Sequence, residues 1–267
     1  MRHLFGNVRT FALVGAAAFL AFSCTSDAEE VLENEQDQKL DQSEVKTILE
    51  TDELSSAADS IVQSLFNNRE SGKSAKDDAC YTADYTDTGF TVSFDQCTVE
   101  EEGEVLNGSL AVVYDEQADS FAYTVTYNDL NIDGIGMNGT RSFSYKAGEE
   151  NSIVFDVVTE MSLTLEDDSV VTEKGNKSFT IAFDEEFGSG VLSVGGEWVV
   201  NANDDSYAVN VTSDLQAQFG CDYIGKGLME LSKNGLTVDV DFGDGTCDDL
   251  GELVYPDGTT ETITLKD

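Results

Sequence analysis

Histidine, proline and basic residues are scarce in this sequence. The 267 residues include one histidine, His3, one proline, Pro256, and 14 Lys plus Arg against 53 Asp plus Glu, a formal net charge of −39. This charge repels phosphate backbones, so we expect no nucleic-acid partner. The histidine falls in a segment that we interpret below as a removed signal peptide. The mature chain would then lack the imidazole that Ser-His-Asp catalysis and most zinc sites require.

Common catalytic and cofactor motifs are missing as well. The sequence contains no Gly-x-x-x-x-Gly-Lys-Ser/Thr phosphate loop, no Gly-x-Ser-x-Gly elbow and no Cys-x-x-Cys pair. We therefore expect a non-enzymatic protein without a cofactor. Carboxylate-pair catalysis, as in glycoside hydrolases, is an alternative because acidic residues are abundant.

The first 24 residues carry an export and anchoring pattern. Arg2 and Arg9 precede an apolar run over residues 11–22, which is too short to span a bilayer but suits a secretory signal peptide. At its end, Ala21-Phe22-Ser23-Cys24 resembles the bacterial lipobox, whose cysteine receives a diacylglyceryl group before cleavage on its amino side. The resemblance implies a signal peptide over residues 1–23 and lipid attachment at Cys24. Ordinary signal peptidase cleavage, which would leave a free thiol, is the alternative.

An acidic segment follows Cys24. Residues 25–44 hold eight carboxylates and one lysine, which predicts a disordered, self-repelling tether over residues 24–50. Within it, Ser26-Asp27-Ala28-Glu29-Glu30 resembles the acidic stretch after the lipidated cysteine of surface-exported lipoproteins of Bacteroidota. The segment Asp241 to Asp249 is similar to a motif near the end of uncharacterised, flavobacterial-type lipoproteins of that group. These resemblances imply an outer-membrane lipoprotein that faces the cell surface, with the periplasmic face as the alternative.

A helical repeat occupies the region after the tether. Apolar residues recur at the spacing of one helix face and predict an amphipathic helix over residues 51–70. Thr51 is the expected N-cap, with Asp52 and Glu53 beside the positive helix end. Val45, Ile48 and Leu49 predict a separate, earlier turn because their stripe is out of phase with the later one. The residues of the main stripe are Leu54, Ala57, Ala58, Ile61, Val62, Leu65 and Phe66.

From Tyr81 onward the apolar period changes to two. Alternation such as Phe121, Tyr123, Val125 and Tyr127 predicts half-buried strands. The alternation from Ile153 to Leu165 covers thirteen positions, and a strand of this length is expected to bend or bulge. We expect an antiparallel meander of about a dozen strands over residues 78–267, forming a curved half-barrel or a sandwich whose one face the helix covers. Six dipeptides predict its hairpin turns: Asn107-Gly108, Asp133-Gly134, Asn138-Gly139, Asn234-Gly235, Asp244-Gly245 and Asp257-Gly258.

An internal repeat predicts the cysteine pairing. The stretch from Gly89 to Asp95 before Cys97 matches the stretch from Gly235 to Asp241 before Cys247, which favours a duplicated β unit. Chance similarity between short strands is the alternative. If each copy owns one upstream and one downstream cysteine, the expected disulfides are Cys80 with Cys97 and Cys221 with Cys247. Cys24 is then the one cysteine left over, as lipidation requires.

Two further features suggest ligands. Asp239, Asp241, Asp244 and Asp248 crowd a glycine-rich turn, with Asp249 and Glu252 nearby, and could hold Ca²⁺ through oxygen ligands, although they miss the EF-hand register. A solvated acidic hairpin is the alternative. Trp198 could stack on a sugar, but we expect it in the core beside Val200, and the same caution applies to Tyr81, Tyr85, Tyr114 and Tyr127.

These features predict a membrane-tethered protein acting as a non-enzymatic binding or structural module. An accessory ligand-capture protein of an outer-membrane uptake system is a second hypothesis, which expects a concave, aromatic-lined pocket. A carboxylate-dependent glycoside hydrolase is a third, which requires two acids facing each other across a cleft.

Overall fold

The computed structural model describes residues 40–70, 80–98, 104–118, 120–148, 151–184 and 188–265. They contain one helix and thirteen strands. In chain order these are α1 (Gln42–Glu70), β1 (Tyr81–Thr86), β2 (Gly89–Cys97), β3 (Leu106–Tyr114), β4 (Ala122–Ile132), β5 (Ile135–Ala147), β6 (Ser152–Thr164), β7 (Val170–Phe183), β8 (Gly190–Ala202), β9 (Asp205–Gln218), β10 (Lys226–Lys233), β11 (Leu236–Asp244), β12 (Leu250–Val254) and β13 (Thr260–Thr264).

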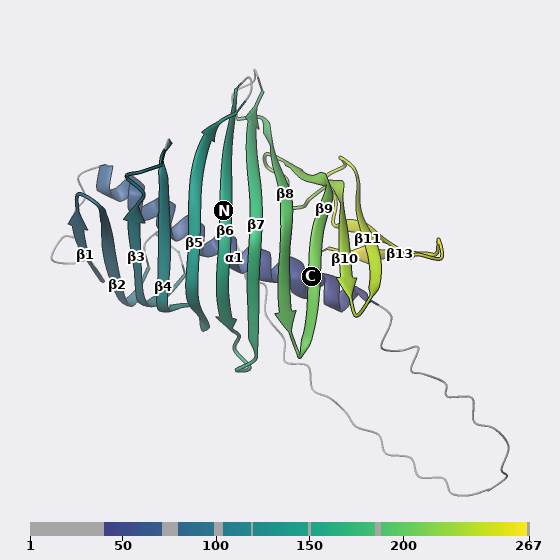
Figure 1. Ribbon diagram of the computed structural model, residues 1–267, viewed down its shortest axis with the longest axis horizontal. Helices are drawn as coiled ribbons and strands as arrows, with labels where there is room; N and C mark the ends of the chain where they lie inside the picture. Colours follow the sequence, from purple (N-terminus) through teal and green to yellow (C-terminus); the bar gives the residue numbers. More distant parts are fainter. Residues whose placement is uncertain are drawn as a thin grey trace, which may run out of the picture. The chain divides into compact units, whose positions relative to one another are not determined.

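All thirteen strands form a single antiparallel meander (Figure 1). Each strand pairs with its neighbours in the sequence, from β1 at one edge to β13 at the other. The sheet is not closed into a barrel. The predicted fold class is confirmed, and of the two arrangements left open by the sequence, the single open sheet is observed rather than two packed sheets.

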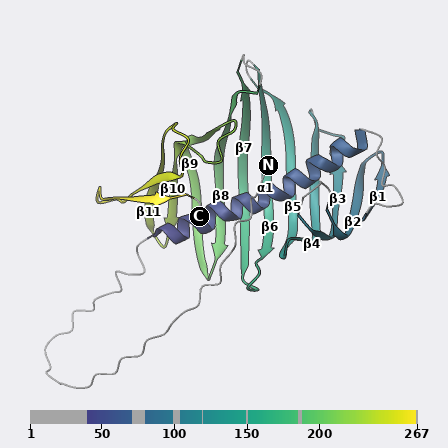
Figure 2. The same cartoon turned by 180° about the vertical axis from the view of Figure 1, so that it is seen from behind.

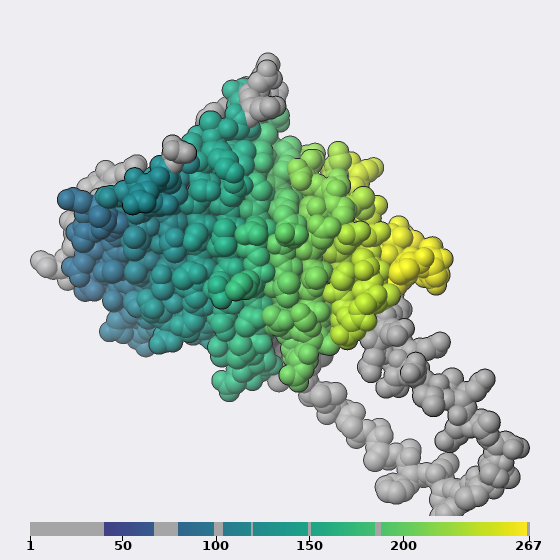
Figure 3. Space-filling model, in the orientation of Figure 1, coloured from purple at the N-terminus to yellow at the C-terminus, as the bar shows by residue number. Residues whose placement is uncertain are grey.

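The helix α1 runs diagonally across one face of this sheet, from the C-terminal strands toward β2 and β3 (Figure 2). We call this the inner face and the opposite one the outer face. Strand residues of one parity turn toward the helix and form the core, for example Val125, Val157 and Val209. In the view of Figure 3, α1 does not lie over the outer face of the central strands. The expectation that the helix covers one face is confirmed.

The helix begins nine residues earlier than predicted. Asp41 is its N-cap: Asp41 Oδ1 accepts hydrogen bonds from the backbone N–H groups of Ser43 (2.9 Å) and Glu44 (3.2 Å). Glu44 Oε2 in turn accepts a hydrogen bond from Asp41 N–H at 2.9 Å, which completes a capping box. The Thr51 hydroxyl donates to the Thr47 carbonyl inside the helix, so the N-cap prediction for Thr51 is wrong. The tether prediction is wrong for residues 42–50.

Polar residues in the buried stripe explain this error. Val45 and Ile48 are fully buried and belong to the same stripe as Ala58, Val62 and Leu65. The positions that join the two halves are Thr51 and Ser55, which are also buried. A search for apolar periodicity alone therefore sees two stripes where the helix has one continuous contact face.

The turn predictions are partly confirmed. Asp133-Gly134, Asn234-Gly235 and Asp257-Gly258 lie in hairpin turns, and the first two pairs have positive φ at both residues. Asn107-Gly108 and Asn138-Gly139 were expected in turns but lie inside β3 and β5. The pairing of β3 with β4 shifts register at Asn107/Ser109, where Gly108 has a φ of 90°, so this dipeptide forms a bulge. The long strand β6 was expected to bend or bulge, and it contains no bulge, because it pairs without a register shift with both β5 and β7.

Candidate functional site

Both predicted disulfides are present. Cys80 bonds to Cys97 and Cys221 bonds to Cys247, with Cα–Cα distances of 4.9 and 5.8 Å. Cys80 directly precedes β1 and Cys97 ends β2, whereas Cys221 precedes β10 and Cys247 follows β11. Each disulfide therefore joins the two ends of one hairpin, with one cysteine before the first strand and the other at or after the end of the second strand. This is the arrangement that the internal repeat predicts.

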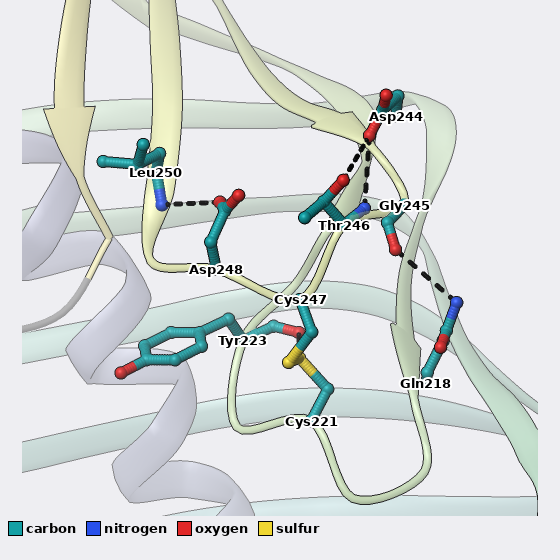
Figure 4. Close-up of a disulfide and its surroundings, with 9 residues drawn as sticks. All are labelled: Gln218, Cys221, Tyr223, Asp244, Gly245, Thr246, Cys247, Asp248 and Leu250. Atoms are coloured by element: carbon teal, nitrogen blue, oxygen red, sulfur yellow. Dashed lines mark hydrogen bonds between the residues drawn. A yellow bond between two sulfur atoms is a disulfide. The ribbon is translucent and has the colours of Figure 1, made fainter.

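Two adjoining hollows lie around the second disulfide, whose surroundings Figure 4 shows. One has a volume of about 170 Å³ and is lined by Cys221, Cys247, Gln216 and Lys226 among others. The other, about 510 Å³, is more open and includes Asp241, Asp248 and Glu252 in its wall. Each lining contains a single aromatic residue, Tyr223 in the first hollow and Phe242 in the second, so neither hollow is the aromatic-lined pocket that ligand capture needs.

Three of the four calcium candidates, Asp241, Asp244 and Asp248, line the more open hollow, but their carboxylates do not converge on one point. Asp241 Oδ1 accepts a hydrogen bond from Gly243 N–H, and Asp248 Oδ1 accepts one from Leu250 N–H. Asp244 Oδ1 accepts bonds from the Thr246 hydroxyl and backbone N–H (Figure 4). The hydroxyl bond lowers the pKa of Asp244 below its ordinary value. Three of these carboxylates thus cap their own turns, and the fourth, Asp239, is exposed on β11. Within the described ranges, no three acidic, His or Cys side chains converge as a metal site requires.

A cluster of charged side chains lies between the middle of α1 and strands β5 and β7. Lys177 is 1% exposed and pairs with Glu173, which is 0% exposed, over 2.7 Å, and also with Asp52 of the helix. The Ser55 hydroxyl donates to the second oxygen of Glu173 at 2.8 Å. On β5, the fully buried Arg141 donates from Nη2 to Asp59 of the helix at 2.8 Å. We call these six residues the charged cluster.

The polar groups around the charged cluster are incompletely satisfied. Within the part of the chain that the structure describes, Arg141 Nε and Nη1, Asp59 Oδ1 and the side-chain polar atoms of Tyr127, Thr159 and Trp198 have no hydrogen-bond partner. Arg141 and Thr159 are register partners on β5 and β6. Unpaired buried polar groups are costly. This part of the helix–sheet contact therefore fixes position more than it adds net stability.

Burial dominates the titration of this region. It raises the pKa of Asp59 to about 6, although the neighbouring Arg141 guanidinium favours the carboxylate. Burial also raises the pKa of Tyr127 well above its ordinary value. The Tyr127 phenol thus stays neutral at physiological pH, and the charge of Asp59 changes in mildly acidic solution.

The two ends of α1 are held by different contacts. At the N-terminal end, Glu44 Oε1 accepts hydrogen bonds from Tyr207 (2.9 Å) and Lys233 (2.6 Å). Gln42 Nε2 also donates to Thr264 Oγ1 of β13 at 2.7 Å. At the C-terminal end, Phe66 lies among aromatic rings, which are Phe90, Tyr114, Phe121 and Tyr123, with centroid distances of 5.3 to 6.4 Å. The helix is therefore bound to the sheet at both ends and in the middle.

The aromatic candidates from the sequence serve packing. Trp198 is 5% exposed and its ring contacts Lys177, whose Nζ lies 4.4 Å from the ring centroid. The expectation that it lies in the core is confirmed. Tyr127 is buried, and Tyr81, Tyr85 and Tyr114 are half-buried and pack against the core on the inner face.

One part of the inner face is not covered by α1. At the ends of β5 to β8 beyond the charged cluster, apolar side chains of inner-face parity are half-buried. Figure 2 shows the upper ends of β6 and β7 standing clear of the helix. We call this surface the apolar shelf; its residues are Tyr145, Ile153, Phe155, Phe179, Ile181, Leu192 and Val194.

No family model, curated protein or solved structure matches this chain. Among the described residues, no helix is long and apolar enough to cross a membrane. The predicted signal peptide, the lipid attachment at Cys24 and the tether up to residue 39 lie outside the described residues.

Proposed function

We propose that this chain is a lipid-anchored lipoprotein of the cell envelope that acts as a non-enzymatic binding module. The cysteine pairing carries the proposal. Four of the five cysteines are consumed in two disulfides, and structural disulfides persist in oxidising compartments outside the cytoplasm. The fifth is Cys24, at the end of an export-type apolar run and in a lipobox-like position.

The position of α1 supports an anchoring role for the N-terminal segment. The chain between Cys24 and Leu40 has 15 residues, which extend over at most about 50 Å. Leu40 itself is buried, and its carbonyl accepts a hydrogen bond from the Tyr255 hydroxyl at 2.9 Å. An anchor at Cys24 would therefore hold the sheet close to the membrane through a segment that joins directly to the core.

The apolar shelf favours a binding role over a purely structural one. The apolar side chains of the shelf are half-buried and lie clear of α1, and an apolar patch gathered on one face commonly marks an interaction surface. We place the binding surface there and assign the acidic surface to solubility and repulsion of anionic partners.

Metabolic labelling with a palmitate analogue tests the anchor. In the native host, the wild-type chain should take up label and stay with membranes in high salt, whereas Cys24→Ser should be unlabelled and released. A matched control removes two other cysteines together, Cys221→Ser with Cys247→Ser, and should keep the label. Equal labelling of the Cys24→Ser variant, or an unlabelled wild type, would contradict the proposal.

A further inference from the structure

The apolar shelf is built from two cross-strand rows. Phe155 on β6 pairs with Tyr145 on β5 and Phe179 on β7, and Val194 on β8 extends this row. In the second row, Ile153, Ile181 and Leu192 follow one another on β6, β7 and β8. With strands about 4.8 Å apart and residues of one face about 7 Å apart along a strand, the two rows give a surface roughly 14 Å long across β5 to β8, with the rows about 7 Å apart.

The shelf is continuous with the surface that α1 already covers. Phe179 and Val194 pack against the buried core beneath the helix, and Phe179 lies two residues along β7 from Lys177 of the charged cluster. Tyr145 and Phe155 meet edge to face at 5.8 Å between centroids. Phe183 and Phe219 extend the apolar surface at its far end, where they are 46% and 38% exposed. The sheet thus offers a second apolar strip beside α1, and its two rows, about 7 Å apart, are spaced so that a helix of about 10 Å diameter can lie over both.

Neither α1 nor the acidic tether sequence suits this strip. The apolar stripe of α1 is already in contact with the core. Residues 25–39 include only two large apolar residues, Val31 and Leu32, and seven residues that are acidic or basic. Those two side chains are too few to cover seven shelf residues.

The charge of the molecule defines the partner further. The chain has a net charge of −39, and Asp184 is exposed directly after β7. An approaching helix with an acidic outer face would be repelled, whereas Lys and Arg on that face would be attracted.

We propose that the apolar shelf is a docking site for an amphipathic helix of a partner protein, with an apolar face toward β5–β8 and a basic opposite face. The partner helix lies beside α1 and packs on the same face of the sheet as α1 does. This goes beyond the proposed anchoring and rests on it in one respect, because the apolar run over residues 11–22 is taken to be removed with the signal peptide.

A designed peptide provides the probe. It is an 18-residue amidated helix with Leu on one face and Lys on the other, titrated by calorimetry into the mature chain, residues 24–267, carrying Cys24→Ser. The wild-type shelf should bind this peptide, whereas a peptide with Glu in place of Lys should not bind. Ile181→Asp and Leu192→Asp should each weaken binding at least tenfold, because the peptide would bury an unpaired carboxylate.

Outer-face neighbours provide matched controls. Thr180→Asp and Ser193→Asp add the same charge one residue away but on the opposite face, and each should change affinity less than twofold. Ile181→Thr is a milder variant that keeps the test valid if Ile181→Asp unfolds, and it should still weaken binding.

Four results would overturn the proposal. These are no binding of the Lys peptide to the wild type, equal binding of the Glu peptide, and equal effects of Thr180→Asp and Ile181→Asp. The fourth is the finding that Ile181→Asp abolishes either a dimer of this chain or its binding to phosphatidylcholine vesicles. The first outcome would assign the shelf to a second copy, and the second would assign it to lipid.

Discussion

Replacing Lys177 by Met tests whether the charged cluster is as tightly coupled as its geometry indicates. Lys177 is 1% exposed and neutralises Glu173, which is 0% exposed, at 2.7 Å. Met keeps most of the length of the side chain and its contact with Trp198, but it removes the charge. Glu173 would then keep the Ser55 hydroxyl as its hydrogen-bond donor and lose its ion-pair partner in the same strand.

The expected cost follows from the burial of both partners. Breaking a buried ion pair by removing one partner lowers the free energy of unfolding by about 3–5 kcal/mol. With a urea m-value of about 2.5 kcal/mol per molar, this shifts the unfolding midpoint down by about 1–2 M. The double variant Lys177→Met with Glu173→Gln should recover most of that loss, because the fully buried carboxylate is then neutral. Asp52, the other partner of Lys177, is 27% exposed and keeps contact with water.

Lys174 on the same strand is the matched control. It pairs with Glu160 at 3.1 Å on the outer face, where both side chains are 69% exposed. Lys174→Met should therefore cost about 0–1 kcal/mol. Urea unfolding followed by circular dichroism measures both variants. If Lys177→Met and Lys174→Met differ by less than 1 kcal/mol, or if the double variant is no more stable than Lys177→Met, the coupling inferred for the cluster is refuted.

Three further predictions follow from the same contacts. The pKa of Asp59 is raised from 3.8 to about 6, so the folded state binds this proton more tightly than the unfolded chain. The contribution of Asp59 to the free energy of unfolding is therefore complete below about pH 4 and is lost as pH rises through 6, by up to about 3 kcal/mol. The difference in free energy of unfolding between wild type and Asp59→Asn, measured from pH 4 to 7, should fall by this amount. A difference that does not change with pH would contradict the prediction. Asp41→Ala removes the N-cap of α1 and should cost about 1 kcal/mol in urea unfolding, whereas no change would mean that the capping box is not formed. Removing the Cys221–Cys247 disulfide, with a separation of 26 residues, should lower the free energy of unfolding by about 3.5 kcal/mol. Removing Cys80–Cys97, with a separation of 17 residues, should lower it by about 3 kcal/mol. Thermal unfolding measures both variants, and unchanged melting temperatures would show that the disulfides do not stabilise the fold.

Local patterns predicted most of the architecture. The period of two after Tyr81 gave the strands, and the Asp-Gly and Asn-Gly pairs placed several hairpins. The repeat around Cys97 and Cys247 predicted both disulfides because each cysteine pair closes one hairpin, which is a local arrangement. Such features depend on neighbours in the sequence and can be recognised without the fold.

The charged cluster depends on contacts between distant segments and was missed. Asp52 and Lys177 are 125 residues apart, and Asp59 and Arg141 are 82 residues apart. A signal was nevertheless present, because Arg141 shares its parity with Met137 and Phe143, and Lys177 shares its parity with Phe179. A charged residue at a core-facing position of an alternating strand requires a buried partner of opposite charge, and the acidic residues of the helix were the available partners.

The mass of the N-terminal peptide of protein extracted from its native membranes tests the central claim most directly. Lipid anchoring predicts that the mature chain begins at Cys24 and that this residue is heavier than cysteine by a diacylglyceryl group, with or without a further acyl chain. A water-soluble protein whose N-terminal residue carries no added mass would contradict it.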